Sequence, residues 1–242
     1  MQDNLAKRIL EFQRRIADEK IDMAIIQDPD NIFYLTGFWG YLGMEFGRPT
    51  ILIVPQSSSP TLVTPGLEAE MATSMTRIKD IRQWTDGIGG EWQTQLDDSF
   101  NRLKSKNVGL EPLKTHPMVS EYIKTKFPVS SLKDVSGILS DMRMVKNPAE
   151  IEVMRQAGQV AVAMCEAAVQ TIAEGVPEYE VSLAAVTAGT RKAAEFIGDQ
   201  NSGKLLSPMI HNLQVFQSGP DLSMVHRRPT LRRIEKGDPV YM

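Results

Sequence analysis

The sequence predicts an α/β N-terminal domain, in which helices cover a mixed sheet, followed by the first part of an α+β domain. Short apolar segments alternate with helical patterns as far as about residue 134, which is typical of helices packed on a sheet. After residue 147, two long helical patterns follow one another, and few strand candidates remain to cover them. We therefore expect domains at 1–134 and 148–242, joined by a linker at 135–147.

The N-terminal domain begins with a predicted amphipathic helix at 4–19, because Leu5, Ile9, Phe12 and Ile16 recur at helical spacing. Turn-rich segments separate the elements that follow. Strands are predicted at 23–26, 50–55, 61–65, 80–84, 107–111 and 128–132. Helical segments are predicted within 27–38 and at 66–76, 92–105, 117–125 and 134–142.

The second domain is predicted to begin with a long helix. Asn147 is a candidate N-cap, Pro148 suits the first helical position, and Glu150 places a negative charge near the helix start. The helix should end at Glu174-Gly175. Its predicted core-facing residues recur every three or four positions: Ile151, Met154, Ala161, Cys165, Ala168 and Ile172. Cys165 is therefore expected to be a small core residue rather than a nucleophile.

A second helix is predicted to open at Pro177, with Glu178 and Glu180 in its first turn. The strand candidates that remain are LQVFQ (213–217) and DPVYM (238–242). They are too few to cover two long helices, so we expect the catalytic domain to be incomplete and the chain to be truncated within it.

Composition excludes several classes of function. The net charge of −3 gives no general affinity for nucleic acid or for an anionic membrane. No apolar run approaches 18 residues, and the charged N-terminus does not resemble a secretory signal. The single cysteine excludes an intrachain disulfide. We expect a cytoplasmic protein with no nucleic-acid or membrane partner.

The stretch MEFGRPT (44–50) is a candidate for binding a small carboxylate-bearing molecule. Pro49 biases Arg48 towards an extended conformation, in which Phe46 and Arg48 would point to the same side. An aromatic ring beside a fork of N–H donors suits such a ligand. From the residues alone, a strand entrance with an exposed arginine is the favoured explanation of the stretch.

The stretch VFQSGPDLSMVHRRP (215–229) contains the main candidate for acid–base chemistry, His226. An imidazole exchanges protons near neutral pH, so one group can accept a proton from water and later deliver it to a leaving nitrogen. The alternative is an ordinary polar residue on a turn. No group of Asp, Glu, His or Cys shows the spacing of metal ligands, so the predicted metal site is none.

Four segments together resemble the creatinase and aminopeptidase P/prolidase family. They are FGRP (46–49), MRMVKNPAEIEVMRQAG (142–158), VPEYEVSL (176–183) and FQSG (216–219) with His226 downstream. The similarity spans nearly the whole chain and is greatest to creatinase. The resemblance implies a creatinase/prolidase-type N-terminal domain followed by a "pita-bread" catalytic domain, in a homodimer.

For a creatinase-like hydrolase, the resemblance implies that His226 shuttles protons while a C–N bond of creatine is cleaved to give sarcosine and urea, without a cofactor. It also implies that Phe46 and Arg48 reach the neighbouring subunit's active site and hold the small-molecule substrate there.

Two alternatives stay open. The first is an activity like that of the metal-dependent Xaa-Pro dipeptidases and aminopeptidases, which would require two divalent metal ions (manganese or cobalt) whose ligands lie after Met242. The second is a non-catalytic pita-bread module that binds a protein partner. In either catalytic case, the 242-residue chain by itself is expected to be inactive, because the acidic or metal-binding partners of His226 are not among its residues.

Overall fold

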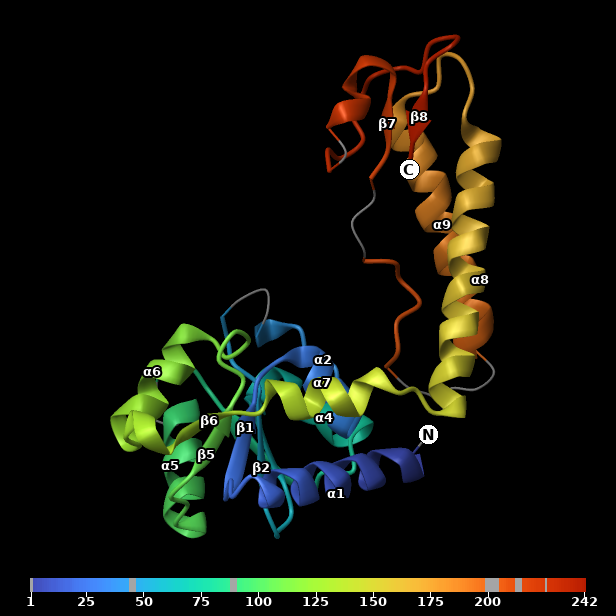
Figure 1. The fold of residues 1–242 in the computed structure, drawn as a ribbon. Coiled ribbons are helices and arrows are strands. Elements are labelled where there is room, and N and C mark those ends of the chain that lie inside the picture. Colours follow the sequence, from blue (N-terminus) through green and yellow to red (C-terminus); the bar gives the residue numbers. More distant parts are fainter. Residues whose placement is uncertain (1, 44–46, 88–90, 199–204, 212–214, 225) are drawn as a thin grey trace. The chain divides into compact units, whose positions relative to one another are not determined.

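The fold consists of two compact units, Met1–Val145 and Lys146–Met242, shown as a ribbon in Figure 1. None of the described helices is both long and apolar enough to cross a membrane. The computed structural model describes residues 2–43, 47–87, 91–198, 205–211, 215–224 and 226–242.

The first unit is built on a mixed sheet. Its described residues contain six strands in the order β4-β3-β2-β1-β5-β6. β1 pairs antiparallel with β2 and parallel with β5, and β2 pairs antiparallel with β3. The outer pairs β3–β4 and β5–β6 are parallel. The predicted mixed sheet is confirmed, with strands β1 (Met23–Ile26), β2 (Ile51–Pro55), β3 (Thr61–Pro65), β4 (Asp80–Trp84), β5 (Val108–Leu110) and β6 (Leu132–Asp134).

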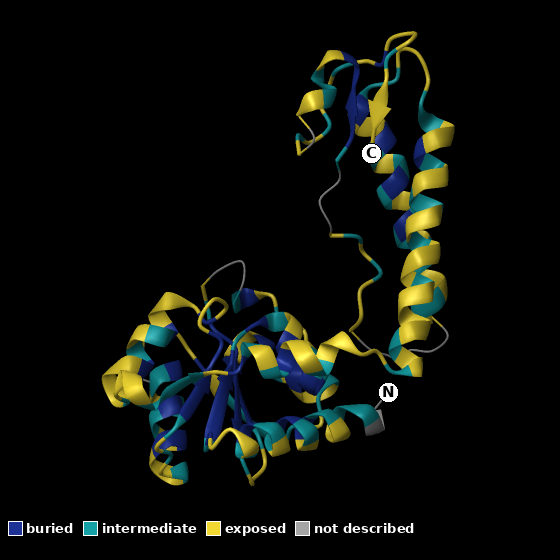
Figure 2. Cartoon of the chain, viewed as in Figure 1, coloured by how far each residue is buried: buried dark blue, intermediate teal, exposed yellow. Residues whose placement is uncertain are grey.

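Helices cover both faces of this sheet. Ala24 and Ile26 of β1 pack in one apolar cluster with residues of α1, α2, α4 and α7. Met23 and Ile25 pack in a second cluster with residues of α5 and α6. Because successive side chains of a strand point to opposite faces, β1 contributes apolar side chains to both clusters and is buried throughout. The neighbouring strands β2, β3 and β5 are also buried throughout, and the centre of the sheet is dark blue in Figure 2. The helices are α1 (Gln2–Asp18), α2 (Pro29–Thr36), α4 (Gly66–Met75), α5 (Trp92–Leu103), α6 (Pro117–Lys126) and α7 (Ser136–Met144).

Two segments near the end of this unit differ in detail from the expectation. The strand expected at 128–132 begins only at Leu132, because Val129–Ser131 form a 3-10 helix in which the Ser131 N–H donates to the Pro128 carbonyl. The segment 135–147, expected as a linker, contains helix α7, which corresponds to the helical segment predicted at 134–142. Its Leu139 is buried in the first apolar cluster, and the units divide after Val145.

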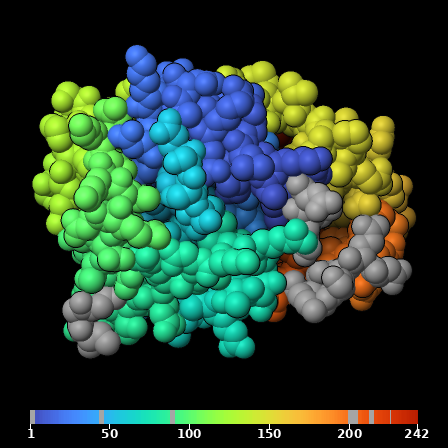
Figure 3. Space-filling view, turned by 90° about the horizontal axis from the view of Figure 1, so that it is seen from below, coloured from blue at the N-terminus to red at the C-terminus, as the bar shows by residue number. Residues whose placement is uncertain are grey.

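The connection between β2 and β3 is fixed against the N-terminal helix. The side-chain amide of Gln13 donates to the carbonyls of Pro55 and Ser58, both at 2.7 Å. Figure 3 shows this connection (cyan) at the surface beside the N-terminal segment (blue). A polar residue of α1 therefore holds the turn where the sheet reverses direction.

The second unit begins with helices α8 (Pro148–Thr171) and α9 (Glu178–Gly198). The predicted cap of α8 is confirmed as a capping box. The Asn147 side chain accepts from the Glu150 N–H at 3.0 Å, and the Glu150 carboxylate accepts from the Asn147 N–H at 2.7 Å. The chain then turns through Gly175 at φ +83° before α9 begins.

The predicted core face of α8 is mostly wrong for the described part of the chain. Ile151, Met154 and Cys165 are exposed, and among the described residues of α8 only Ala168 is fully buried. Figure 2 shows α8 largely in yellow. The physical reason is that α8 packs along α9, which covers one side of it. At that contact Gly189 lies so close to Met164 that an added Cβ would sit 2.5 Å from the Met164 Cγ.

The remaining described elements of this unit are short. Strand β7 (Gln217–Ser218) pairs antiparallel with β8 (Val240–Tyr241), and the 3-10 helix η2 (Gly219–Ser223) follows β7 directly. Phe216, immediately before β7, is buried against Ala168, Val181, Ala185 and Ile234. This small core places the segment that carries His226. Strands were predicted at 213–217 and 238–242. The observed strands β7 and β8 overlap these ranges at residue 217 and at residues 240–241, and residues 213 and 214 lie outside the described residues.

Candidate functional site

His226 lies on a turn that follows β7 and η2, and its side chain is exposed. The chain around it is tied to the unit by hydrogen bonds. The Arg227 N–H donates to the Met224 carbonyl at 2.8 Å, and the Gln217 side-chain amide donates to the Arg227 carbonyl at 2.5 Å. The imidazole is thus accessible to a solute while the residue that follows it is held.

A buried carboxylate lies beneath this turn. Glu178, in the first turn of α9, has no exposed surface. The Arg227 guanidinium donates to both of its oxygens, at 2.8 and 2.9 Å. Ser218 donates through its N–H and its hydroxyl at 2.9 and 2.8 Å, and Thr230 does the same at 2.9 and 2.7 Å. Glu178 therefore joins α9 to the segments on either side of His226.

These contacts decide the charge of Glu178. Burial by itself would raise the pKa of this carboxyl group, but hydrogen bonds from Arg227, Thr230 and Ser218 outweigh it and hold the pKa well below the ordinary value of 4.5. The same contact with Glu178 raises the pKa of Arg227. Both groups are charged at neutral pH, and the pair is a buried, bidentate ion pair.

A second pair extends the network towards the end of β7. The Arg232 guanidinium donates to Asp238 at 2.6 Å and to the Ser218 hydroxyl at 2.7 Å. Gly219 lies against this pair with φ +62°, and a Cβ there would sit 2.6 Å from the Arg232 Nη2. The glycine of FQSG is thus required both by its backbone conformation and by the close approach of Arg232.

The depressed pKa of Glu178 predicts acid sensitivity of the second unit. Because the folded pKa lies below the unfolded value, the carboxylate contributes stability above about pH 4.5, and the contribution is lost as pH falls through the folded pKa. We expect the urea midpoint of the α8–α9 unit, followed by far-ultraviolet circular dichroism, to fall steadily below pH 4.5. In Glu178→Gln this dependence should be weaker. It should persist in Glu180→Gln, which removes an exposed carboxylate from the same helical turn. Equal pH dependence in all three proteins would contradict the assignment.

The other predicted site residue that the structure describes is Arg48, in the first unit. Its guanidinium forms an ion pair with Asp86 at 2.6 Å, with both side chains partly exposed. Phe46 lies outside the described residues, so its expected position beside Arg48 stays a prediction. His226 belongs to the other unit.

A buried carboxylate also contacts described residues on both sides of Arg48. Glu68 of α4 accepts hydrogen bonds from the N–H groups of Tyr41 and Leu42 at 2.9 and 3.2 Å, and from the Thr50 hydroxyl at 3.4 Å. Tyr41 and Thr50 lie on either side of Arg48 in the sequence. Tyr41, Leu42 and Thr50 are therefore anchored to α4 through Glu68.

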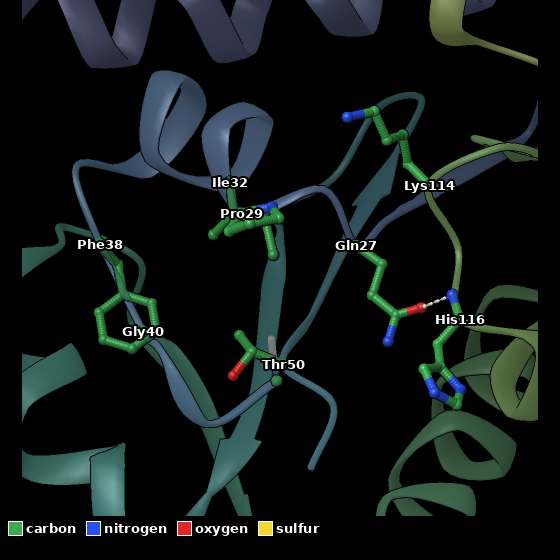
Figure 4. A pocket seen from close by; sticks show the side chains of 9 residues that line it. Gln27, Pro29, Ile32, Phe38, Gly40, Thr50, Lys114 and His116 are labelled. Atoms are coloured by element: carbon green, nitrogen blue, oxygen red, sulfur yellow. Dashed lines mark hydrogen bonds between the residues drawn. The ribbon is translucent and has the colours of Figure 1, made fainter. Parts of the chain in front are cut away.

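The first unit also contains a shallow pocket of about 230 Å³ beside α2, shown in Figure 4. Several polar groups around it are engaged with their neighbours. The His116 N–H donates to the Gln27 side chain at 2.8 Å, and the His116 Nδ1 accepts from the Met118 N–H as the N-cap of α6. Lys114 pairs with Asp28 at 3.1 Å. His116 therefore has a clear structural role as a helix cap.

The described residues offer no metal site. Among them, no three His, Cys, Asp or Glu side chains converge on a point that could hold a metal ion. The described residues by themselves therefore do not form a two-metal centre.

Sequence reasoning missed Glu178 and Arg227 as parts of the site. In the sequence, Glu178 is recognisable only as an acidic residue in the first turn of a predicted helix, and Arg227 only as a basic residue next to His226. Their pairing spans 49 residues of sequence. No local pattern in the sequence signals such a contact.

Family comparisons account for most of the chain. Residues 8–145 match the Creatinase/Prolidase N-terminal domain, and residues 152–242 match Metallopeptidase family M24. The chain is 24% identical over 239 residues to the Xaa-Pro dipeptidase of Pyrococcus furiosus, covering 98% of this chain and 60% of that protein. It is 26% identical over 238 residues to a creatinase of a Bacillus species, covering 98% and 55%.

Solved structures show the same fold. An Xaa-Pro dipeptidase from Bacillus anthracis superimposes with a TM-score of 0.74 at 20% identity, covering 97% of this chain and 59% of that one. The prolidase from Pyrococcus furiosus gives a TM-score of 0.74 at 23% identity, covering 95% and 63%. The chain thus spans somewhat more than half the length of these relatives, and its units have the fold of the corresponding part.

Proposed function

Because the chain belongs to the creatinase/prolidase family, with a Creatinase/Prolidase N-terminal domain followed by a Metallopeptidase family M24 segment, we propose that the protein is a hydrolase that cleaves a C–N bond of a small carboxylate-bearing substrate. The candidate substrate is creatine, with urea and sarcosine as products. The observation that supports this proposal is the exposed His226 on a turn whose neighbouring residue is held by a buried carboxylate.

In the proposed reaction, His226 transfers the proton. The imidazole accepts a proton from water as the water oxygen bonds to the carbon of the C–N bond. It then delivers that proton to the departing nitrogen as the C–N bond breaks. One water is consumed, and the histidine returns to its starting form. An exposed, well-held imidazole suits both transfers because it can reach the water and then the leaving group.

Arg48 is proposed to bind the carboxylate of the substrate, together with Phe46, in the active site of a neighbouring subunit of a homodimer. A guanidinium binds a carboxylate through two parallel hydrogen bonds. In the described structure the Arg48 Nη2 contacts the Asp86 carboxylate at 2.6 Å. Substrate binding would therefore exchange one carboxylate partner for another.

The peptidase alternative has specific support. Residues 152–242 match Metallopeptidase family M24, and Xaa-Pro dipeptidases are among the relatives of this chain. Such an activity would need two divalent ions, manganese or cobalt, and the described residues do not form a site for them. The same histidine and the same N-terminal loop would then serve a dipeptide substrate.

The product of the complete reading frame tests the proposal directly. We expect it to release urea from creatine, and we expect the rate to survive EDTA. Cleavage of Xaa-Pro dipeptides that is stimulated by manganese or cobalt and abolished by EDTA would favour the peptidase instead. A protein that hydrolyses neither class of substrate would contradict the hydrolase proposal and favour a binding module.

Arg48→Ala is expected to raise KM for the carboxylate substrate roughly ten- to hundredfold, since a hydrogen-bonded charge contact contributes about 1.5–3 kcal/mol. Steady-state kinetics of the complete protein measures this. The unfolding free energy should change by less than about 1 kcal/mol, because the pair with Asp86 is partly exposed. Arg82→Ala, which breaks pairs with Asp80 and Asp98 instead, is the matched control and should leave KM unchanged. A KM unaffected by Arg48→Ala would remove Arg48 from the substrate site.

A further inference from the structure

Glu178 is a fully buried carboxylate for which the proposed reaction has no direct use. Burying a charge is costly unless it is paired and hydrogen-bonded, and an apolar side chain often stabilises a core equally well. The described core of the second unit is small, with Ala168, Val181, Ala185, Phe216 and Ile234 as its buried apolar residues. A buried charge in so small a core therefore indicates that Glu178 has a role other than packing.

The residues that donate hydrogen bonds to Glu178 lie on both sides of His226 in the sequence. Six hydrogen bonds to its carboxylate are found in the described part of the chain, two each from Ser218, Arg227 and Thr230. Ser218 precedes His226 and the other two follow it, at sequence separations of 40 to 52 residues from Glu178. The carboxylate therefore holds both ends of the segment that carries the imidazole.

Arg227 is the most direct link because it adjoins His226. Its guanidinium binds both oxygens of Glu178, its N–H donates to Met224, and its carbonyl accepts from Gln217. The Arg227 side chain is only 17% exposed, whereas His226 is exposed. The residue that follows the histidine is thus fixed by contacts with Glu178, Met224 and Gln217, while the imidazole is exposed and accessible to a ligand.

We propose that Glu178 is a positioning residue for His226. From the first turn of α9 it anchors Ser218, Arg227 and Thr230, and this anchoring fixes where the imidazole is presented. The catalytic meaning of this role rests on the proposed function, but the placement of His226 is a property of the folded chain and is measurable without any substrate.

The first experiment is proton NMR of the histidine rings in the 242-residue chain. The chain has three histidines, His116, His211 and His226, so the signal lost in His226→Gln identifies the third. We expect Glu178→Gln to move the His226 signal towards its position in the urea-unfolded chain or to broaden it. The other two signals should stay unchanged, and the control Glu180→Gln should leave all three in place.

Arg227→Lys provides a second test that does not alter the helix. It keeps the positive charge but loses the bidentate contact, and the same change at His226 is expected. Circular dichroism establishes that each variant retains the helical content of the parent. Unchanged His226 signals in folded Glu178→Gln and Arg227→Lys would overturn the proposal.

The second experiment measures kinetics of the complete protein. Glu178→Gln is expected to lower kcat roughly tenfold or more while KM stays within about twofold, because a displaced proton-transfer group weakens the reaction rather than substrate binding. Combined with His226→Ala, the substitution should cost nothing further. Activity that depends on His226 but not on Glu178 would overturn this inference and leave the proposed function intact. A complete protein with no activity would refute the function, while the NMR result would still decide the positioning role.

Discussion

His226→Ala is expected to lower kcat of the complete protein by about 10²–10⁴-fold, the usual contribution of a positioned acid–base group. The substitution removes the group proposed to carry a proton from water to the leaving nitrogen. KM should change little, since the substrate carboxylate is proposed to be held by Arg48. Steady-state assays with creatine and with an Xaa-Pro dipeptide measure both parameters.

The matched control is His211→Ala. His211 is also exposed and lies before β7, outside the network around Glu178. We expect it to retain full activity. If His226→Ala kept full activity, or if both variants lost it equally, His226 would not be the proton-transfer group.

Phe216→Ala is expected to lower the unfolding free energy of the second unit by about 3–5 kcal/mol, the usual cost of truncating a buried phenylalanine. Phe216 is 1% exposed and packs with Ala168, Val181, Ala185 and Ile234. Its loss leaves a cavity in a small core, next to the strand that leads to His226.

The distribution of aromatic residues allows this effect to be measured unit by unit. The three tryptophans, Trp39, Trp84 and Trp92, all lie in the first unit. In a urea titration, tryptophan fluorescence should therefore stay as in the parent, while the dichroism of α8 and α9 should be lost at lower urea. Leu183→Ala, which truncates a side chain 53% exposed on α9, should cost less than about 1 kcal/mol. A Phe216→Ala protein as stable as this control would mean that Phe216 is not part of the core.

The first unit could be predicted from the sequence because its signals are local. Alternating apolar and helical segments gave the mixed sheet, and Ile9, Phe12 and Ile16 of α1 are buried as their spacing predicted. The cap of α8 was likewise predicted from Asn147, Pro148 and Glu150, which are neighbours in the chain. The segment 129–131 was harder, because a 3-10 turn and a short strand draw on similar residues.

The second unit was predicted less well because its features depend on what packs against them. A helical apolar stripe indicates a face that favours burial but does not supply the partner, so Cys165 was expected in a core and is exposed. The site shows the same contrast between local signals and contacts that depend on the fold. His226 and Arg48 could be proposed from sequence motifs, whereas the contacts of Glu178 with Arg227 and of Arg48 with Asp86 join distant residues. Such contacts exist only once the chain has folded.

The pairing of Glu178 with Arg227 also has an evolutionary consequence. Either residue without the other would leave an uncompensated charge in a largely buried position, at a cost of about 3–5 kcal/mol. That cost is a large fraction of the stability of an ordinary domain. Among homologous proteins, a neutral residue at position 178 should therefore occur together with the loss of arginine at position 227. Sequences that carry only one of the two changes should be rare, because the remaining charge would be unpaired.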